Sequence, residues 1–99
     1  MGEMRRAAKS DANQPDIVAA LRAVGALVFH THQVGQGFVD LVVLFRGYVH
    51  LIEVKTQGGK LTEPEKRWHA SWGDSEYVHI VYDVHEALEA IGATLPKSQ

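Results

Sequence analysis

The chain has 99 residues, which fits one small domain, and it contains ten Lys or Arg, twelve Asp or Glu, six His and no Cys. The lack of Cys excludes disulfides, thiolate zinc sites and a cysteine nucleophile, and it fits a reducing compartment. No apolar stretch approaches the roughly 20 residues of a membrane-spanning helix, and the N-terminal basic residues, which no apolar run follows, are not expected to form a secretory signal. We therefore expect a soluble protein without membrane contact.

The formal net charge of −2 counts mildly against a nucleic-acid binder, because phosphate contacts usually produce a basic excess. The charge is unevenly distributed, however. Residues 1–72 hold nine basic and seven acidic side chains, whereas residues 73–99 hold one basic and five acidic ones. The acidic quarter also fits the solvated outer face of a helix, so any surface for DNA is expected in the earlier part of the chain.

Three regions follow one another along the chain. Residues 1–12 are polar and rich in Ala, and they predict a flexible basic arm. A single domain is expected over residues 13–95, followed by a short tail over 96–99. No internal repeat or Pro-rich linker divides the domain.

The domain opens with a predicted helix. Asn13 or Gln14 can cap it, Pro15 favours its first turn, and apolar residues then recur at helical spacing until Gly25 ends it. Residues 26–30 are short, apolar and partly β-branched, which predicts a strand.

The strongest strand signals are Phe38–Phe45 and Tyr48–Lys55. Arg46 and Gly47 connect them, and a two-residue connection containing Gly suits a tight hairpin because Gly accepts a positive φ. In the resulting register Phe45 faces Tyr48, and each further pair follows from it.

Two capping-box patterns predict the later helices, one from Thr62 with Glu65 and one from Asp83 with Glu86. Between these helices, residues 78–81 predict a third clear apolar strand. The order is therefore αβββαβα, and the strand–helix–strand step implies a right-handed crossover and a mixed sheet flanked by helices, an α/β fold.

Three charged residues interrupt the hairpin strands: Asp40, Glu53 and Lys55. Their neighbours are almost all apolar, namely Val39, Leu41, Val42, Val43, Leu44, Phe45, Val49, Leu51, Ile52 and Val54. Ionised groups in such surroundings are costly unless they are paired or bind a metal. The hairpin register places Asp40 opposite Glu53, where like charges repel.

A divalent cation with oxygen ligands would explain two facing carboxylates. Strand alternation points Lys55 to the same side as Glu53, where a lysine can hold a phosphate or orient the attacking water. Together these parts predict a metal-dependent phosphodiester hydrolase. A structural role remains the alternative, in which Asp40 ends a strand and the other two residues line an edge.

With Asp40 on one strand and Glu53-Val54-Lys55 on the next, the chain resembles the PD-(D/E)XK nuclease superfamily. More narrowly, it resembles a stand-alone VRR-NUC domain of the phage or bacterial type over nearly its whole length. The matching features are the Arg5-Arg6 arm, the helix from Gln14, the Gly35–Gly37 turn, the Leu51–Lys55 strand, the Leu61-Thr62 helix start and the Glu86–Gly92 helix.

The resemblance implies a small restriction-endonuclease-like fold with a four-stranded mixed sheet. It implies that Asp40, Glu53 and the Val54 carbonyl hold Mg²⁺ or Mn²⁺, and that Lys55 is the catalytic lysine. The expected activity is an endonuclease cutting branched DNA such as Holliday junctions, acting as a homodimer. The expected location is the cytoplasm of a bacterial or phage-infected cell.

Three positions depart from the family pattern. Val39 stands where proline is usual before the aspartate. Gln14 replaces a first-helix glutamate that would be a metal ligand; it can hold a metal-bound water but carries no charge, and Asp16 would point elsewhere. Glu65 stands where glutamine is common.

Other residues carry weaker signals. His30 and His32 could join a metal site or be ordinary strand-end residues, and the turn from Gln33 to Gly37 could approach a phosphate or be a plain turn. On the later helix, Trp68, His69 and Trp72 favour a packing stripe over a base-stacking platform. Candidate DNA contacts, which could equally be solvated side chains, are Arg5, Arg6, Lys9, Lys60, Lys66 and Arg67.

Two other functions remain open at this point. The chain could be a non-catalytic or weakly active DNA-binding module whose site has decayed with the loss of the first-helix carboxylate. It could also be a nuclease that acts on ordinary duplex DNA.

Overall fold

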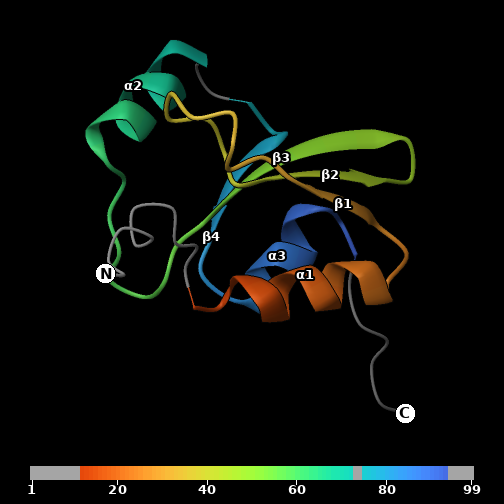
Figure 1. The fold of residues 1–99 in the computed structure, drawn as a ribbon. Helices are drawn as coiled ribbons and strands as arrows, with labels where there is room; N and C mark the ends of the chain where they lie inside the picture. The colour runs from red at the N-terminus through yellow and green to blue at the C-terminus, as the bar shows by residue number, and fades with distance from the viewer. Residues whose placement is uncertain (1–11, 73–74, 94–99) are drawn as a thin grey trace.

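The computed structural model describes residues 12–72 and 75–93, which form a four-stranded sheet and three helices (Figure 1). The elements in chain order are α1 (Gln14–Ala23), β1 (Leu27–His30), β2 (Leu41–Phe45), β3 (Tyr48–Val54), α2 (Glu63–Trp72), β4 (Val78–Val81) and α3 (Val84–Ala90). The predicted α/β class and the order αβββαβα are confirmed. No helix within the described ranges is long and apolar enough to cross a membrane.

The sheet has the strand order β1-β2-β3-β4, with the first three strands antiparallel and β4 parallel to β3. The hairpin register is the predicted one and runs from the pair Phe45–Tyr48 to the pair Leu41–Ile52. Arg46 and Gly47 have φ values of 52° and 85°. Two successive positive φ angles match the twist of the flanking strands and give a tight two-residue turn.

Strand β2 begins at Leu41, so the prediction that it starts at Phe38 is wrong. The Asp40 N–H still donates to the Ile52 carbonyl, at 3.1 Å. The next donor on β3, the Val54 N–H, is taken by the Asp40 carboxylate (Oδ2, 2.8 Å). A side-chain oxygen therefore replaces the backbone carbonyl that a longer strand would have supplied, and the ladder stops.

The core lies between one face of the sheet and the pair α1 and α3, which lie side by side (Figure 1). The most deeply buried side chains, each without solvent exposure, include Ile17 and Leu21 of α1 and Leu41, Val43 and Ile52 of the sheet. Alternation along β3 places Ile52 and Val54 in this core and turns Leu51 and Glu53 to the opposite face.

Asn13 occupies the N-cap position of α1, but its side chain does not cap the helix as predicted. Its Nδ2 instead donates to the carbonyls of Lys55 (3.2 Å) and Tyr82 (2.8 Å). These carbonyls follow the ends of β3 and β4, so a single amide fastens the start of α1 to the end of the sheet where Glu53 lies.

The opposite face of the sheet carries α2 at only one end (Figure 1). Apolar side chains on this face are correspondingly exposed, among them Leu27, Phe29 and Val49, which are 58%, 52% and 53% exposed. Helix α2 buries none of its own residues fully. Its position therefore depends on a few specific contacts, which also build the candidate site.

Candidate active site

Glu53 is the central residue of the candidate site. Its position on β3 turns it to the α2 face of the sheet, where it is 0% exposed. Neither carboxyl oxygen has a hydrogen-bond partner among the described residues. Burial raises the pKa of Glu53 to about 9, and the neighbouring Asp40 and Glu65 carboxyls add to the rise. Without a bound cation, Glu53 is therefore protonated at neutral pH.

Asp40 approaches Glu53 from the bend that precedes β2. The regular ladder ends one residue short of it, so Asp40 is not a ladder partner of Glu53 in the way the extended register predicted. Burial raises the pKa of Asp40, while the hydrogen bond from the Val54 N–H and the adjacent Glu53 carboxyl oppose that rise. The two carboxyls thus lie close together, although the backbone that brings them there is a bend.

Lys55 follows the last residue of β3, and its side chain lies on the same side as Glu53, as strand alternation predicts. Its Nζ is 3.7 Å from Glu53 Oε2 and 2.9 Å from Glu65 Oε1. The side chain is only 13% exposed. The ammonium group therefore lies beside the Glu53 and Glu65 carboxyls, between the sheet and α2.

Glu65 performs two tasks with one oxygen. The predicted capping box is confirmed, since the Thr62 N–H donates to Glu65 Oε1 at 2.8 Å and the Glu65 N–H donates to Thr62 Oγ1 at 3.3 Å. The same Oε1 contacts Lys55 Nζ. Burial alone would raise the pKa of Glu65, but the hydrogen bonds from Lys55 and Thr62 hold it below its ordinary value.

His69 is a site residue that the sequence pattern assigned to a packing stripe on the helix. It lies one turn after Glu65 on α2, and its Nε2 is 3.9 Å from Glu53 Oε1. Burial lowers the pKa of His69, although the charge of Glu65 opposes this, so the ring is neutral near pH 7. The spacing of four between Glu65 and His69 predicts a shared helix face, which was the available signal.

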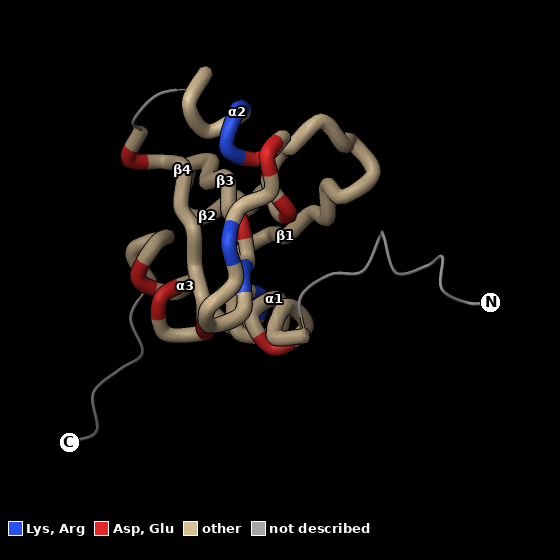
Figure 2. Tube along the Cα trace, turned by 90° about the vertical axis from the view of Figure 1, so that its left-hand side faces the viewer, with Lys and Arg blue, Asp and Glu red and all other residues tan. Residues whose placement is uncertain are grey.

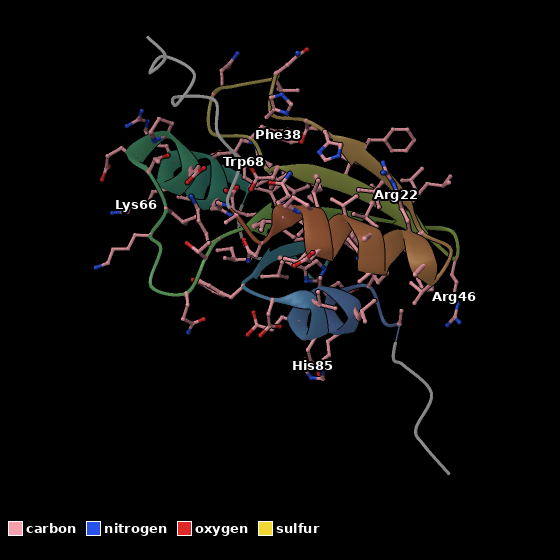
Figure 3. The ribbon with its side chains drawn as sticks, turned by 60° about the horizontal axis from the view of Figure 1, so that its bottom comes forward. Arg22, Phe38, Arg46, Lys66, Trp68 and His85 are labelled. Carbon is pink, nitrogen blue, oxygen red and sulfur yellow. The ribbon has the colours of Figure 1, made fainter. Side chains whose placement is uncertain are left out.

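Two contacts hold α2 against the site. Phe38 packs edge-on against Trp68, with ring centroids 5.3 Å apart (Figure 3). Gly37 lies so close to α2 that a Cβ there would come within 2.2 Å of the Pro64 carbonyl oxygen. The Gln33–Gly37 turn thus has a packing role; its predicted approach to a phosphate stays a prediction.

Gln14 is buried at 4% exposure, and its Nε2 lies 3.5 Å from Nδ1 of His30. No hydrogen bond joins it to Asp40 or Glu53 in the part of the chain that the structure describes. Its adjacent residue Asn13 contacts the Lys55 carbonyl, so Gln14 belongs to the same end of the sheet. Its role as a metal ligand stays a prediction.

The candidate DNA contacts divide into two groups. Lys60, Lys66 and Arg67 are exposed, and Lys66 also pairs with Glu63 at 3.3 Å. The trace shows basic and acidic positions next to each other on α2, whereas the charged positions of α3 are acidic (Figure 2). The other predicted contacts, Arg5, Arg6 and Lys9, lie outside the described residues.

The donor set fits a hard divalent cation. The buried Glu53 carboxyl lies beside the half-buried Asp40 carboxyl, and the Glu53 oxygens have no hydrogen-bond partner among the described residues. The Val54 N–H points to Asp40, and the N–H and C=O of one strand residue point to the same side, so the Val54 carbonyl faces this edge as well. Within residues 12–72 and 75–93, no three His, Asp or Glu side chains are already arranged as a metal site. The cation would therefore be bound by two carboxylates, a carbonyl and water.

Comparison with known proteins does not assign the chain to a family. No family model, curated protein sequence or solved structure matches it. The resemblance to VRR-NUC nucleases therefore stays an expectation from the sequence.

Proposed function

We propose that the protein is a Mg²⁺- or Mn²⁺-dependent endonuclease that hydrolyses phosphodiester bonds in DNA. The observation that carries the proposal is Glu53, a buried carboxyl without hydrogen-bond partners among the described residues, beside the half-buried Asp40 carboxyl and a lysine. Such an arrangement destabilises the fold unless it binds something, because a buried acid with no partner loses its hydration. A cation-binding role gives the arrangement a function.

Each residue then has a distinct task. A bound divalent cation would polarise the phosphate and lower the pKa of the attacking water. Asp40, Glu53 and the Val54 carbonyl would hold the cation. Lys55 would orient the attacking water or balance the charge that develops on the phosphate. Glu65 would keep Lys55 in place through the 2.9 Å contact.

The preference for branched DNA and the homodimer follow from the resemblance, and two features of the chain agree with DNA binding and with the pairing of two copies. Helix α3, whose charged positions are acidic, lies on the opposite side of the sheet from α2, so its charges are placed away from the site (Figures 1 and 2). A 99-residue chain buries little core, and pairing two copies would shield exposed apolar side chains such as Phe29.

The test is cleavage of a synthetic four-way junction and a matched linear duplex, each in Mn²⁺, Mg²⁺ or EDTA. The proposal expects metal-dependent, symmetric cuts on the junction and none on the duplex. Asp40→Ala should abolish cutting. Asp16→Asn is the matched control, because Asp16 is exposed on α1 and should leave the rate unchanged.

The two alternative functions give different results in the same assay. A DNA-binding module would bind the junction without cutting it, and Asp40→Ala would leave binding intact. A nuclease for ordinary DNA would cut the junction and the duplex equally. Cleavage that persists in EDTA, or in Asp40→Ala, would contradict the metal-dependent mechanism.

A further inference from the structure

Two histidines meet on the face of the sheet that α1 and α3 cover, away from the candidate active site. His50 of β3 and His79 of β4 stand on neighbouring strands, and Nδ1 of His50 lies 3.3 Å from Nε2 of His79. His50 lies on an inner strand of the sheet and is 6% exposed. Alternation along β3 turns Glu53 to the other face, so this pair is separate from the carboxylates.

The separation of the two nitrogens is the one that a tetrahedral metal requires. Zinc binds imidazole nitrogen at about 2.0–2.1 Å, and two tetrahedral ligands at that distance are about 3.3 Å apart. His50 and His79 have this spacing in the structure. A metal would take the place of the hydrogen bond: the ring that now donates would carry its single proton on its other nitrogen instead, so each neutral ring would keep one proton and offer one lone pair to the metal.

Helix α3 supplies a candidate third ligand. A groove of about 590 Å³ is lined by His79, Glu86 and Glu89, and a second groove of about 390 Å³ is lined by His50, Tyr77 and Glu89. Glu89 is therefore the acidic residue that borders both histidines. No third His, Asp or Glu in the described ranges is already in place, so Glu89 has to turn toward the pair.

Rotation of the Glu89 side chain toward the histidines gives up a weak surface contact. The Glu89 carboxylate now lies 3.4 Å from Nε2 of His85, and both side chains are largely exposed, at 62% and 79%. Surface pairs of this kind contribute little to stability, so giving up the contact costs little. Figure 3 shows His85 on the outer side of α3, away from the sheet.

The protonation states also suit a metal. Burial lowers the pKa of His50 and of His79, and their proximity lowers that of His79 further. Both rings are therefore neutral near pH 7, as metal ligands must be. Imidazole nitrogen favours Zn²⁺, Cu²⁺ and Ni²⁺, whereas paired carboxylates favour Mg²⁺ and Mn²⁺. The two places in the protein thus select different cations.

We propose that His50, His79 and Glu89 form a site for a zinc-class transition metal, with water completing the coordination. The metal links β3, β4 and α3 and so fastens the last helix to the sheet. The site does not depend on nuclease activity, and it holds whether or not the protein cuts DNA.

The experiment uses the full, tag-free chain labelled with ¹⁵N, because a polyhistidine tag would itself bind zinc. ZnCl₂ is titrated to one equivalent while the side-chain nitrogens of all six histidines are followed by long-range ¹H–¹⁵N correlation. The ring signals of His50 and His79 should shift together and saturate at one equivalent. Zinc should also raise the melting temperature, and Cu²⁺ should show nitrogen hyperfine coupling from two imidazoles.

Variants separate this site from the carboxylates. His50→Gln and His79→Gln should each remove the zinc-dependent rise in melting temperature, and Glu89→Gln should weaken zinc affinity by about tenfold or more. His32→Gln, in an exposed loop, and Glu53→Gln should leave the effect unchanged. Because His50→Gln alters a buried residue, the wild-type histidine signals provide the decisive readout. Zinc shifts confined to other histidines, or an unchanged zinc affinity in Glu89→Gln, would overturn the three-ligand site.

Discussion

Lys55 Nζ lies 2.9 Å from Glu65 Oε1, the same oxygen that accepts the Thr62 N–H at the start of α2. The capping of a helix and the placement of the candidate catalytic lysine therefore share one atom. A local feature that begins α2 also joins it to the end of β3. The consequence is that changes at Glu65 can be separated into an effect on the helix and an effect on the lysine.

Glu65→Gln should separate these two effects. Glutamine can still accept the Thr62 N–H, so the helix cap should remain, but Lys55 loses its charged partner. A hydrogen bond to a charged group is worth about 1.5–3 kcal/mol, so cleavage should fall by roughly ten- to a hundredfold. Glu65→Ala should lose the cap as well, at about 1 kcal/mol of unfolding free energy. Glu63→Gln, on the exposed side of the same helix, is the control. Equal cleavage by Glu65→Gln and the wild type would show that Lys55 does not need Glu65.

Metal binding should be measurable as stability. Millimolar Mn²⁺ should raise the melting temperature of the wild type, because a ligand that binds only the folded state stabilises it. Each 1 kcal/mol gained should raise the melting temperature by about 4–8 °C in a domain of this size. Asp40→Asn and Glu53→Gln should abolish the effect, whereas His79→Gln should retain it. A Mn²⁺ effect that survives in Glu53→Gln would mean that the cation binds elsewhere.

The raised pKa of Glu53 gives the metal-free protein a defined pH dependence. The unfolded chain releases this proton near pH 4.5, whereas the folded protein keeps it until about pH 9. The folded state therefore binds more protons in this range, so the free energy of unfolding falls as pH rises, by at most about 1.4 kcal/mol per pH unit. Asp40 is shifted in the same direction.

The measurement belongs between pH 7 and 9, in EDTA, by urea denaturation. Below that range, the lowered pKa values of His50, His69 and His79 act in the opposite direction, because these rings must gain a charge as the protein unfolds in acid. Glu53→Gln should flatten the slope and raise stability at pH 7, because the variant no longer has to take up a proton on folding at a side chain that is ionised in the unfolded chain. A wild-type slope of zero would contradict the buried, protonated state.

Much of the fold could be predicted from local sequence signals. The turn at Arg46-Gly47 fixed the hairpin register, and the pair Thr62 and Glu65 fixed the start of α2, because both depend on residues close together in the chain. The start of β2 could not be predicted. It depends on the Asp40 carboxylate capturing the Val54 N–H across the hairpin, a competition between side chain and backbone that apolar patterning does not express.

In the candidate site, too, some residues follow from local sequence patterns and others depend on how distant elements pack. Glu53 and Lys55 share a strand face, which the alternation of two already requires. His69 and the second task of Glu65 depend on where α2 is placed over the sheet, and this follows from Phe38, Trp68 and the close approach at Gly37. The pairing of His50 with His79 likewise depends on the parallel contact of β3 with β4, two strands that are separated by a helix in the sequence.

Restoring an acid at position 14 should strengthen cation binding. Gln14 is buried at the start of α1, beside the residue that contacts the Lys55 carbonyl. Gln14→Glu should therefore give a larger Mn²⁺-dependent rise in melting temperature than the wild type. His30 lies 3.5 Å from Gln14 and could hold the new carboxylate instead, so the double variant with His30→Gln tests that possibility. Gln36→Glu, in an exposed turn, is the control. Identical Mn²⁺ effects in all three variants and the wild type would remove position 14 from the site.

Gly37 should be required for the placement of α2. Gly35 and Gly37 both have positive φ, at 71° and 80°, so alanine strains the backbone at either position, by about 1–2 kcal/mol. Only at Gly37 would the new Cβ meet the Pro64 carbonyl, at 2.2 Å, while the space at Gly35 is open. Gly37→Ala should therefore displace α2, with Glu65 and His69, and reduce cleavage far more than Gly35→Ala.

The only two Trp residues, Trp68 and Trp72, are both on α2, so their fluorescence reports the position of this helix directly. Gly37→Ala should change the emission spectrum and Gly35→Ala should not. If the two variants match in fluorescence and activity, the contact with Pro64 does not position the helix.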